Sequence, residues 1–133
     1  MGRLRDFLAP LVPTADFADL QVAQFAHGQS NPTYMLTPGK GNRLVLRKQP
    51  PGKLLRGAHD VLREGTIMEK LRGIVPVPTV RAKCEDAGIA GTPFIVYDMV
   101  EGRQLLDVCM PELADEPGRR SDVLCGLART LGR

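Results

Sequence analysis

The chain has 133 residues, enough for one small domain with a hydrophobic core. Hydrophobic residues make up 43% of the sequence and charged residues 25%, and the formal net charge is +3, as in an ordinary globular protein. The lysines and arginines are spread along the sequence, without a basic run interleaved with aromatic residues, so composition argues against nucleic-acid binding. No apolar run in the sequence approaches the length of a membrane span.

The three cysteines, Cys84, Cys109 and Cys125, form no C-x-x-C pair, so neither a zinc site nor a disulfide framework is predicted. Free and partly buried thiols indicate a reducing compartment, and the predicted location is cytoplasmic. The apolar stretch near the N-terminus is broken by Pro10 and is too short for a secretory signal peptide.

The first half of the chain predicts one short helix and three strands. Apolar residues at helical spacing predict a helix over residues 3–11. Strands are predicted over residues 20–25, 33–37 and 43–49, joined by turns at residues 27–32 and 38–42. Three consecutive strands joined by short turns favour an antiparallel sheet.

The second half predicts a helix over residues 58–72, and strands over residues 80–85 and 94–99 that a turn through Gly88 and Gly91 connects. A polar stretch extends to about residue 118, and a final helix covers the sequence DVLCGLARTL. The predicted fold class is therefore α+β, with five antiparallel strands and one helix packed on the sheet.

The strand over residues 43–49 carries the first candidate site. Strand alternation places Val45 and Arg47 on one face, and Leu44, Leu46 and Lys48 on the other. An apolar side chain beside a cation is what a nucleotide requires, because its base needs a flat apolar surface and its phosphates need positive charge. The alternative is a solvated cation at the end of a strand.

Glu64 gives this cation a candidate partner. It falls in the apolar stripe of the predicted helix, between Val61 and Met68. A buried carboxylate is costly unless it is paired, and Arg47 on the preceding strand could pair with it through two hydrogen bonds. Alternatively, Glu64 lies at the edge of the stripe and reaches water.

The turn containing Gly28, Ser30 and Asn31 is a candidate phosphate-binding turn. Glycine tolerates a positive φ, and serine and asparagine donate hydrogen bonds from both side chain and backbone. An ordinary hairpin turn would have a similar sequence. His27 and His59 are predicted to be solvated and not catalytic.

Five segments resemble a known family: GQSNPTYML, LVLRKQPPGKLL, LREGTIMEKL, VPVP and GTPFIVYDMVEGR, in this order across residues 28–103. They resemble the aminoglycoside phosphotransferase-like kinases, and most of all the kinase-like domain associated with some acyl-CoA dehydrogenases. The resemblance implies a protein-kinase-like N-lobe over residues 1–102. Residues 103–133 would then form a linker and the first helix of a truncated C-lobe.

The resemblance also implies an activity, the transfer of the γ-phosphate of ATP to the hydroxyl of a small molecule with Mg²⁺ as cofactor. Gly28, Ser30 and Asn31 would cover the ATP phosphates. Arg47 would contact them from the strand, at a position where many kinases have lysine. The adjacent Lys48 is the alternative, and strand alternation favours Arg47.

The remaining implied roles lie on the helix and the last strand. Glu64 would pair with the strand cation, and Tyr97 would stand at the back of the nucleotide pocket. Asp98, Met99 and Val100 would form the hinge, whose backbone C=O and N–H groups bind the edge of adenine.

The catalytic H-x-D-x-x-x-x-N motif of this family, and the later aspartate that holds Mg²⁺, are not found in the sequence. We therefore expect no catalytic or metal-binding residue in this chain, and interpret it as an N-terminal fragment that is inactive alone. The alternatives are a complete, non-catalytic nucleotide-binding or interaction module and a basic surface that binds nucleic acid. Apolar residues on the final helix predict self-association. The acceptor remains open among antibiotics, sugars, choline-like compounds and hydroxyacyl compounds.

Overall fold

The computed structural model describes residues 2–26, 30–53, 57–102, 105, 107 and 109–132. The chain divides into two compact units. The first unit comprises Met1–Arg72 and Pro76–Val100, and the second comprises Gly73–Val75 and Glu101–Arg133. All of the strands, and the candidate site, belong to the first unit.

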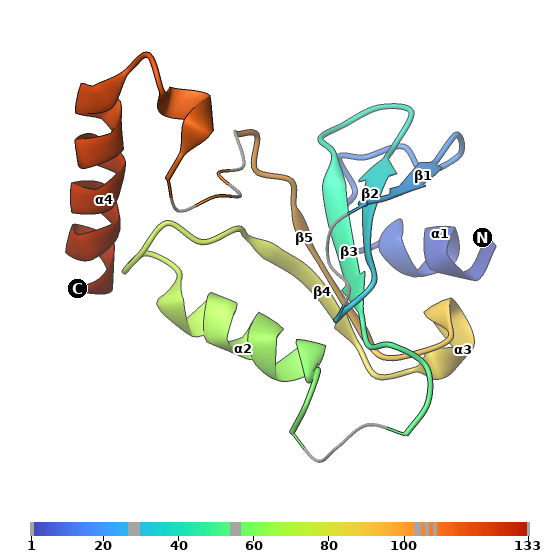
Figure 1. Ribbon diagram of the computed structural model, residues 1–133. Coiled ribbons are helices and arrows are strands. Elements are labelled where there is room, and N and C mark those ends of the chain that lie inside the picture. Colours follow the sequence, from blue (N-terminus) through green and yellow to red (C-terminus); the bar gives the residue numbers. More distant parts are fainter. Residues whose placement is uncertain are drawn as a thin grey trace. The chain divides into compact units, whose positions relative to one another are not determined.

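The first unit is built on one five-stranded sheet (Figure 1). Its strands are β1 (Gln21–Gln24), β2 (Thr33–Thr37), β3 (Leu44–Lys48), β4 (Val80–Cys84) and β5 (Phe94–Asp98). They pair in the order β1-β2-β3-β5-β4, and each neighbouring pair is antiparallel. The predicted α+β class and the five strands are confirmed, and each strand end falls within one residue of its predicted place.

The register of the sheet fixes which side chains share a face. Arg47 is opposite Thr33 on β2 and Ile95 on β5, while Val45 is opposite Tyr97. Because directly opposite residues in a ladder point to the same side, these five side chains lie on one face of the sheet.

The other face carries the hydrophobic core. Its buried side chains include Leu36, Leu44, Leu46, Phe94 and Val96. Two helices cover this face, α1 (Gly2–Leu8) and α3 (Ala87–Ala90) (Figure 1). From α1, Leu4 and Leu8 enter the core, and Phe7 meets Phe94 edge-on at 5.6 Å between ring centroids.

Helix α3 was not predicted, because its four residues are too few to show a helical period. It begins at Asp86, whose carboxylate accepts a hydrogen bond from the Gly88 N–H at 2.7 Å. It ends at Gly91, which adopts the left-handed conformation at φ +88°. The expectation of one helix on the sheet is therefore incomplete, since helices cover both faces.

Helix α2 (Val61–Leu71) packs against β4 and β5 on the face opposite α1 and α3 (Figure 1). It begins three residues later than predicted, because Asp60 caps it by accepting a hydrogen bond from the Arg63 N–H at 3.0 Å. Val61 and Gly65 are its buried residues. The absence of a side chain at Gly65 lets the helix approach β5 closely.

The second unit contains the 3₁₀-helix η1 (Pro111–Leu113) and helix α4 (Pro117–Leu131). Helix α4 begins earlier than predicted, with Pro117 in the first turn, where a missing N–H costs nothing. Four of its apolar side chains are exposed: Val123, Leu124, Leu127 and Leu131. Within the described part of the chain, no helix is both long and apolar enough to cross a membrane.

Candidate functional site

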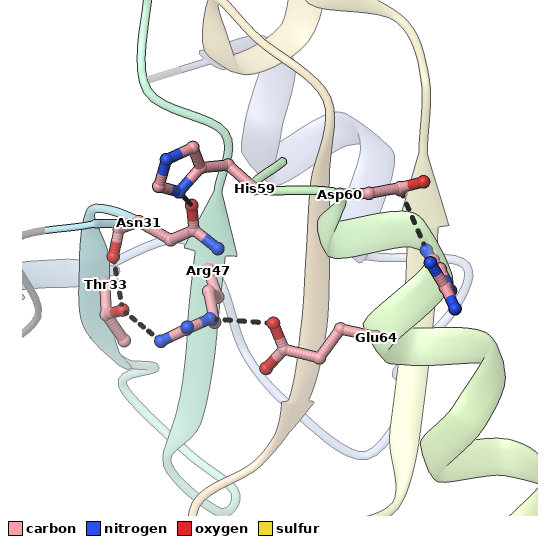
Figure 2. Close-up of polar contacts among 7 residues, drawn as sticks. Asn31, Thr33, Arg47, His59, Asp60 and Glu64 are labelled. Carbon is pink, nitrogen blue, oxygen red and sulfur yellow. Dashed lines mark hydrogen bonds and ion pairs between the residues drawn. The ribbon is translucent and has the colours of Figure 1, made fainter. Parts of the chain in front are cut away.

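The expected ion pair between β3 and α2 is present (Figure 2). The Arg47 Nε donates to Glu64 Oε2 at 3.0 Å, and Arg47 Nη1 donates to the Thr33 hydroxyl at 3.4 Å. The two charged side chains are 28% and 38% exposed, so the pair contributes at most about 1 kcal/mol to stability. Its main effect is to hold the guanidinium of Arg47 in one place between two elements.

The turn before β2 is linked to the same cation. The Thr33 hydroxyl, which accepts from Arg47, donates to the Asn31 backbone carbonyl at 2.9 Å. Asn31 is only 5% exposed. Of the predicted turn residues, Ser30 is exposed and Gly28 lies outside the described residues.

His59 is also part of this network, which corrects the expectation that it is solvated. Its Nδ1 lies 3.1 Å from Asn31 Oδ1, and its side chain is half-buried. Figure 2 shows the Asn31 amide nitrogen directed away from His59. His59 has a left-handed backbone at φ +58°, which is uncommon for a residue with a side chain. No sequence signal connected His59 to Asn31, because the contact depends on how the segment before α2 folds back.

Val45 and Tyr97 lie beside the ion pair on the same face. Val45 is 5% exposed, and Tyr97 is half-buried opposite it on β5. Burial raises the pKa of Tyr97 above its ordinary value of 10.0 and is the largest effect. The positive charge of Arg47 lowers this pKa by a smaller amount, and the negative charge of Glu64 raises it further. The phenol is therefore within electrostatic range of both charges.

This raised pKa predicts a loss of stability at high pH. In the unfolded chain Tyr97 ionises near 10.0, while in the folded chain it keeps its proton to a higher pH. The unfolded state therefore releases the proton first, and the free energy of unfolding falls as the pH rises from about 10 to the folded pKa. Phenolate absorbance of the Tyr34→Phe variant, whose only tyrosine is Tyr97, measures the folded pKa. A midpoint at or below the ordinary value would contradict this.

The carboxylate of Asp98, at the end of β5, is committed to a structural contact. Arg81 on β4 holds it with two hydrogen bonds, from Nε and from Nη2, both at 2.7 Å. The hydrogen bonding to Asp98 raises the pKa of Arg81. The side chain of Asp98 is therefore not free to bind a ligand, and any role in a hinge would be left to its backbone.

The backbone donors of the predicted hinge differ in availability. The Asp98 N–H donates to the Thr79 carbonyl and the Met99 N–H to the Arg43 carbonyl, both at 3.0 Å. The Val100 N–H donates no hydrogen bond within the described chain, and this residue is 64% exposed. Of the three predicted hinge residues, Val100 is thus the one whose N–H has no acceptor in the described chain.

Lys48 is not brought to this site. Its ammonium lies on the core-facing side of β3, where it donates to the Ala90 carbonyl at 2.9 Å and lies 6.0 Å from the centre of the Tyr34 ring. Arg47 is therefore the cation that pairs with Glu64, and its contact with phosphate stays a prediction.

No cluster of three or more metal-ligating side chains occurs among the residues that the structure describes. Cys84 is buried and unpaired, and Cys109 and Cys125 are exposed and unpaired. On the Arg47 face, the described groups offered to a ligand are the Arg47 guanidinium, the Asn31 side-chain amide, the apolar side chain of Val45 and the Val100 N–H.

Comparisons with known proteins agree with this architecture. Residues 21–133 match the model of the APH phosphotransferase enzyme family. A solved structure from Ralstonia eutropha JMP134, whose description assigns it to the aminoglycoside phosphotransferases, superposes with a TM-score of 0.66 at 33% identity. The match covers 83% of this chain and 30% of that one.

Curated relatives carry the name acyl-CoA dehydrogenase. The probable acyl-CoA dehydrogenase IBR3 of Arabidopsis thaliana is 42% identical over 86% of this chain and 14% of the relative. Acyl-CoA dehydrogenase family member 10 of Mus musculus is 41% identical over 98% of this chain and 12% of the relative. Acyl-CoA dehydrogenase family member 11 of Homo sapiens is 39% identical over 87% of this chain and 15% of the relative. The chain thus spans about one seventh of these relatives. By its family match and its kinase-like fold, the chain belongs to the phosphotransferase enzyme family.

Proposed function

We propose that this chain is the ATP-binding part of a small-molecule phosphotransferase, which transfers the γ-phosphate of ATP to a substrate hydroxyl. The observation that carries the proposal is the Arg47 guanidinium, fixed by Glu64 and Thr33 on an otherwise apolar face of β3 and β5. The donors of Arg47 Nη2 have no partner in the described part of the chain, so they are available to a phosphate.

In this proposal the ion pair prepares the site before the nucleotide binds. A guanidinium already held in place loses little conformational freedom when it contacts phosphate, and its planar fork suits phosphate oxygens. The side-chain amide of Asn31 is a further donor from the turn before β2. Transfer of this kind depends mainly on positioning and on electrostatic stabilisation, which these groups would supply.

Adenine would bind at the other end of the same face. Val45 exposes only 5% of its surface, so it can make only a small apolar contact with the base and not the broad one that was expected of it. The Val100 N–H, which has no acceptor within the described residues, would donate to the adenine edge. Tyr97 would lie between the base and the ion pair, at the back of the site.

The residues described here do not fit a Mg²⁺ site, because no carboxylate cluster is present among them. We assign no step of the reaction to a metal held by this chain. The catalytic aspartate and the Mg²⁺ ligands would come from further sequence of a longer protein, and the curated relatives are long enough to hold such sequence, since this chain matches 12–15% of their length.

Calorimetric titration of the 133-residue chain with ATP tests the proposal. We expect ATP to bind, and adenosine to bind more weakly because it lacks the phosphates that contact Arg47. Purified chain should also transfer no measurable phosphate from Mg²⁺-ATP to small hydroxyl compounds. Failure of ATP to bind would reject the nucleotide site, and measurable transfer would reject the assignment of catalysis to missing sequence.

The alternative is a non-catalytic nucleotide-binding or interaction module. The downstream coding sequence distinguishes the two, since a reading frame that continues into an H-x-D-x-x-x-x-N motif supports the phosphotransferase. Because curated relatives are named acyl-CoA dehydrogenases, a hydroxyl-bearing acyl compound is the acceptor class to test first.

A further inference from the structure

A cavity lies on the opposite side of the sheet from Arg47. It has a volume of about 330 Å³, and its lining is mostly apolar, with Leu4 from α1, Leu36 and Leu46 from the sheet, and Ile89 from α3. Helices α1 and α3 are joined at this side by a hydrogen bond from Arg3 Nη1 to the Gly88 carbonyl at 3.0 Å. This hydrogen bond therefore connects α1 and α3, the two helices that line the cavity.

Lys48 brings an uncompensated charge to this apolar lining. Its ammonium has three donors, and the described structure uses one of them, in the bond to the Ala90 carbonyl at 2.9 Å. No carboxylate in the described chain forms an ion pair with Lys48, whereas Lys83, on the opposite face of the sheet, pairs with Glu69 at 2.6 Å. Lys48 is half-buried, so its other two donors are left to water, which the carboxylate of an anionic ligand can replace.

A second polar group faces the same space. Tyr34 lines the cavity, its ring lies 6.0 Å from the Lys48 ammonium, and its hydroxyl makes no hydrogen bond with the described residues. An ammonium and a phenol beside an apolar cavity together suit a ligand with one anionic end and an apolar body.

We propose that this cavity binds a medium-chain carboxylate, with its alkyl chain against the exposed or half-buried side chains of Val22, Ile89 and Ala90 and its carboxylate on Lys48. The volume of about 330 Å³ is at the small end of ligand pockets, which favours a chain of moderate length over a long one. The carboxylate accepts from the free donors of the ammonium and from the Tyr34 hydroxyl.

This site is separate from the nucleotide site. Arg47 and Lys48 are adjacent on β3 and therefore point to opposite faces of the sheet. A carboxylate bound at Lys48 leaves the Arg47 face uncovered, so it should bind equally well with and without ATP. The inference thus goes beyond the proposed phosphotransferase function and does not depend on it.

Calorimetric titrations of the full chain with octanoate, octanol and octylamine test the proposal. We expect octanoate to bind about tenfold or more tightly than octanol, because a hydrogen bond to a charged group adds to the apolar contact, and octylamine to bind weakest. Methyl spectra should place the bound chain at Val22, Ile89 and Ala90. Absence of octanoate binding, or equal binding of octanoate and octanol, would overturn the proposal. This test uses only the wild-type chain, so it does not depend on whether a variant folds.

Two charge-matched variants then locate the anion. Lys48→Met keeps a long apolar stem and should lower the octanoate affinity to that of octanol, with octanol binding unchanged. Lys70→Met removes the same charge from an exposed position in the last turn of α2 and should bind octanoate like the wild type. Equal losses in both variants, or no loss in Lys48→Met, would show that Lys48 does not hold the carboxylate.

Discussion

Replacement of Arg47 by methionine is expected to weaken ATP binding by about tenfold to a hundredfold, the effect of losing charge-assisted hydrogen bonds to phosphate. The guanidinium is held by Glu64 Oε2 at 3.0 Å and by the Thr33 hydroxyl. The side chain of Arg47 therefore loses little conformational entropy when it binds the phosphates. Methionine keeps an unbranched apolar stem on β3 and removes only the charge and the donors. Calorimetric titration with ATP measures the change.

Two controls separate this effect from general damage. Adenosine has no phosphates, so its affinity should be the same for wild type and Arg47→Met. Lys70→Met lowers the net charge equally and should leave ATP binding unchanged. An Arg47→Met variant that binds ATP like the wild type would remove Arg47 from the site.

Glu64 should act through Arg47 and not through the nucleotide. Glu64→Gln should therefore weaken ATP binding less than Arg47→Met, and the two changes together should cost little more than Arg47→Met alone. Simple additivity of the two losses would mean that Glu64 does not act by holding the cation.

Replacement of Gly65 by valine is expected to lower the free energy of unfolding by about 2 kcal/mol, a typical cost of overpacking. A Cβ at this position would lie 3.0 Å from Ile95 Cγ2 and 3.2 Å from Lys83 Cδ, so α2 would have to move away from β5. Since Glu64 is the preceding residue on α2, the same movement should loosen its pair with Arg47 and weaken ATP binding.

Gly126→Val is the matched control for this change. Gly126 also lies within a helix, α4, but a Cβ there would meet no atom within 4 Å. The free energies of unfolding of both variants follow from denaturant titration. A Gly65→Val variant as stable as Gly126→Val would show that α2 and β5 are not closely packed at this point.

The sheet and the ion pair were predictable because they follow from local rules. The two-residue period of a strand puts Val45 and Arg47 on one face whatever the neighbouring strands do. The position of Glu64 in the apolar stripe of a helix suggested a partner on the preceding strand, and the pair is present although the carboxylate stays 38% exposed and also reaches water.

Features that depend on long-range geometry were not predictable. The contact between His59 and Asn31 joins residues that are 28 positions apart in the sequence. It also occurs with a left-handed backbone at His59, which the sequence does not indicate. The Arg81–Asp98 pair arises where the register of β4 against β5 shifts between Val80 and Ala82, and a single sequence carries no sign of this irregularity.

Amide spectra of the ¹⁵N-labelled chain during titration with ATP would locate a bound nucleotide on one face of the sheet. We expect the largest shifts at the Val100 N–H and at the Arg47 Nε–H, with smaller shifts at Asn31 and Tyr97. Signals of Lys48 and Ala90, on the opposite face, should change little. Shifts confined to that opposite face, or no shifts at saturating ATP, would contradict a nucleotide site between Arg47 and Val100.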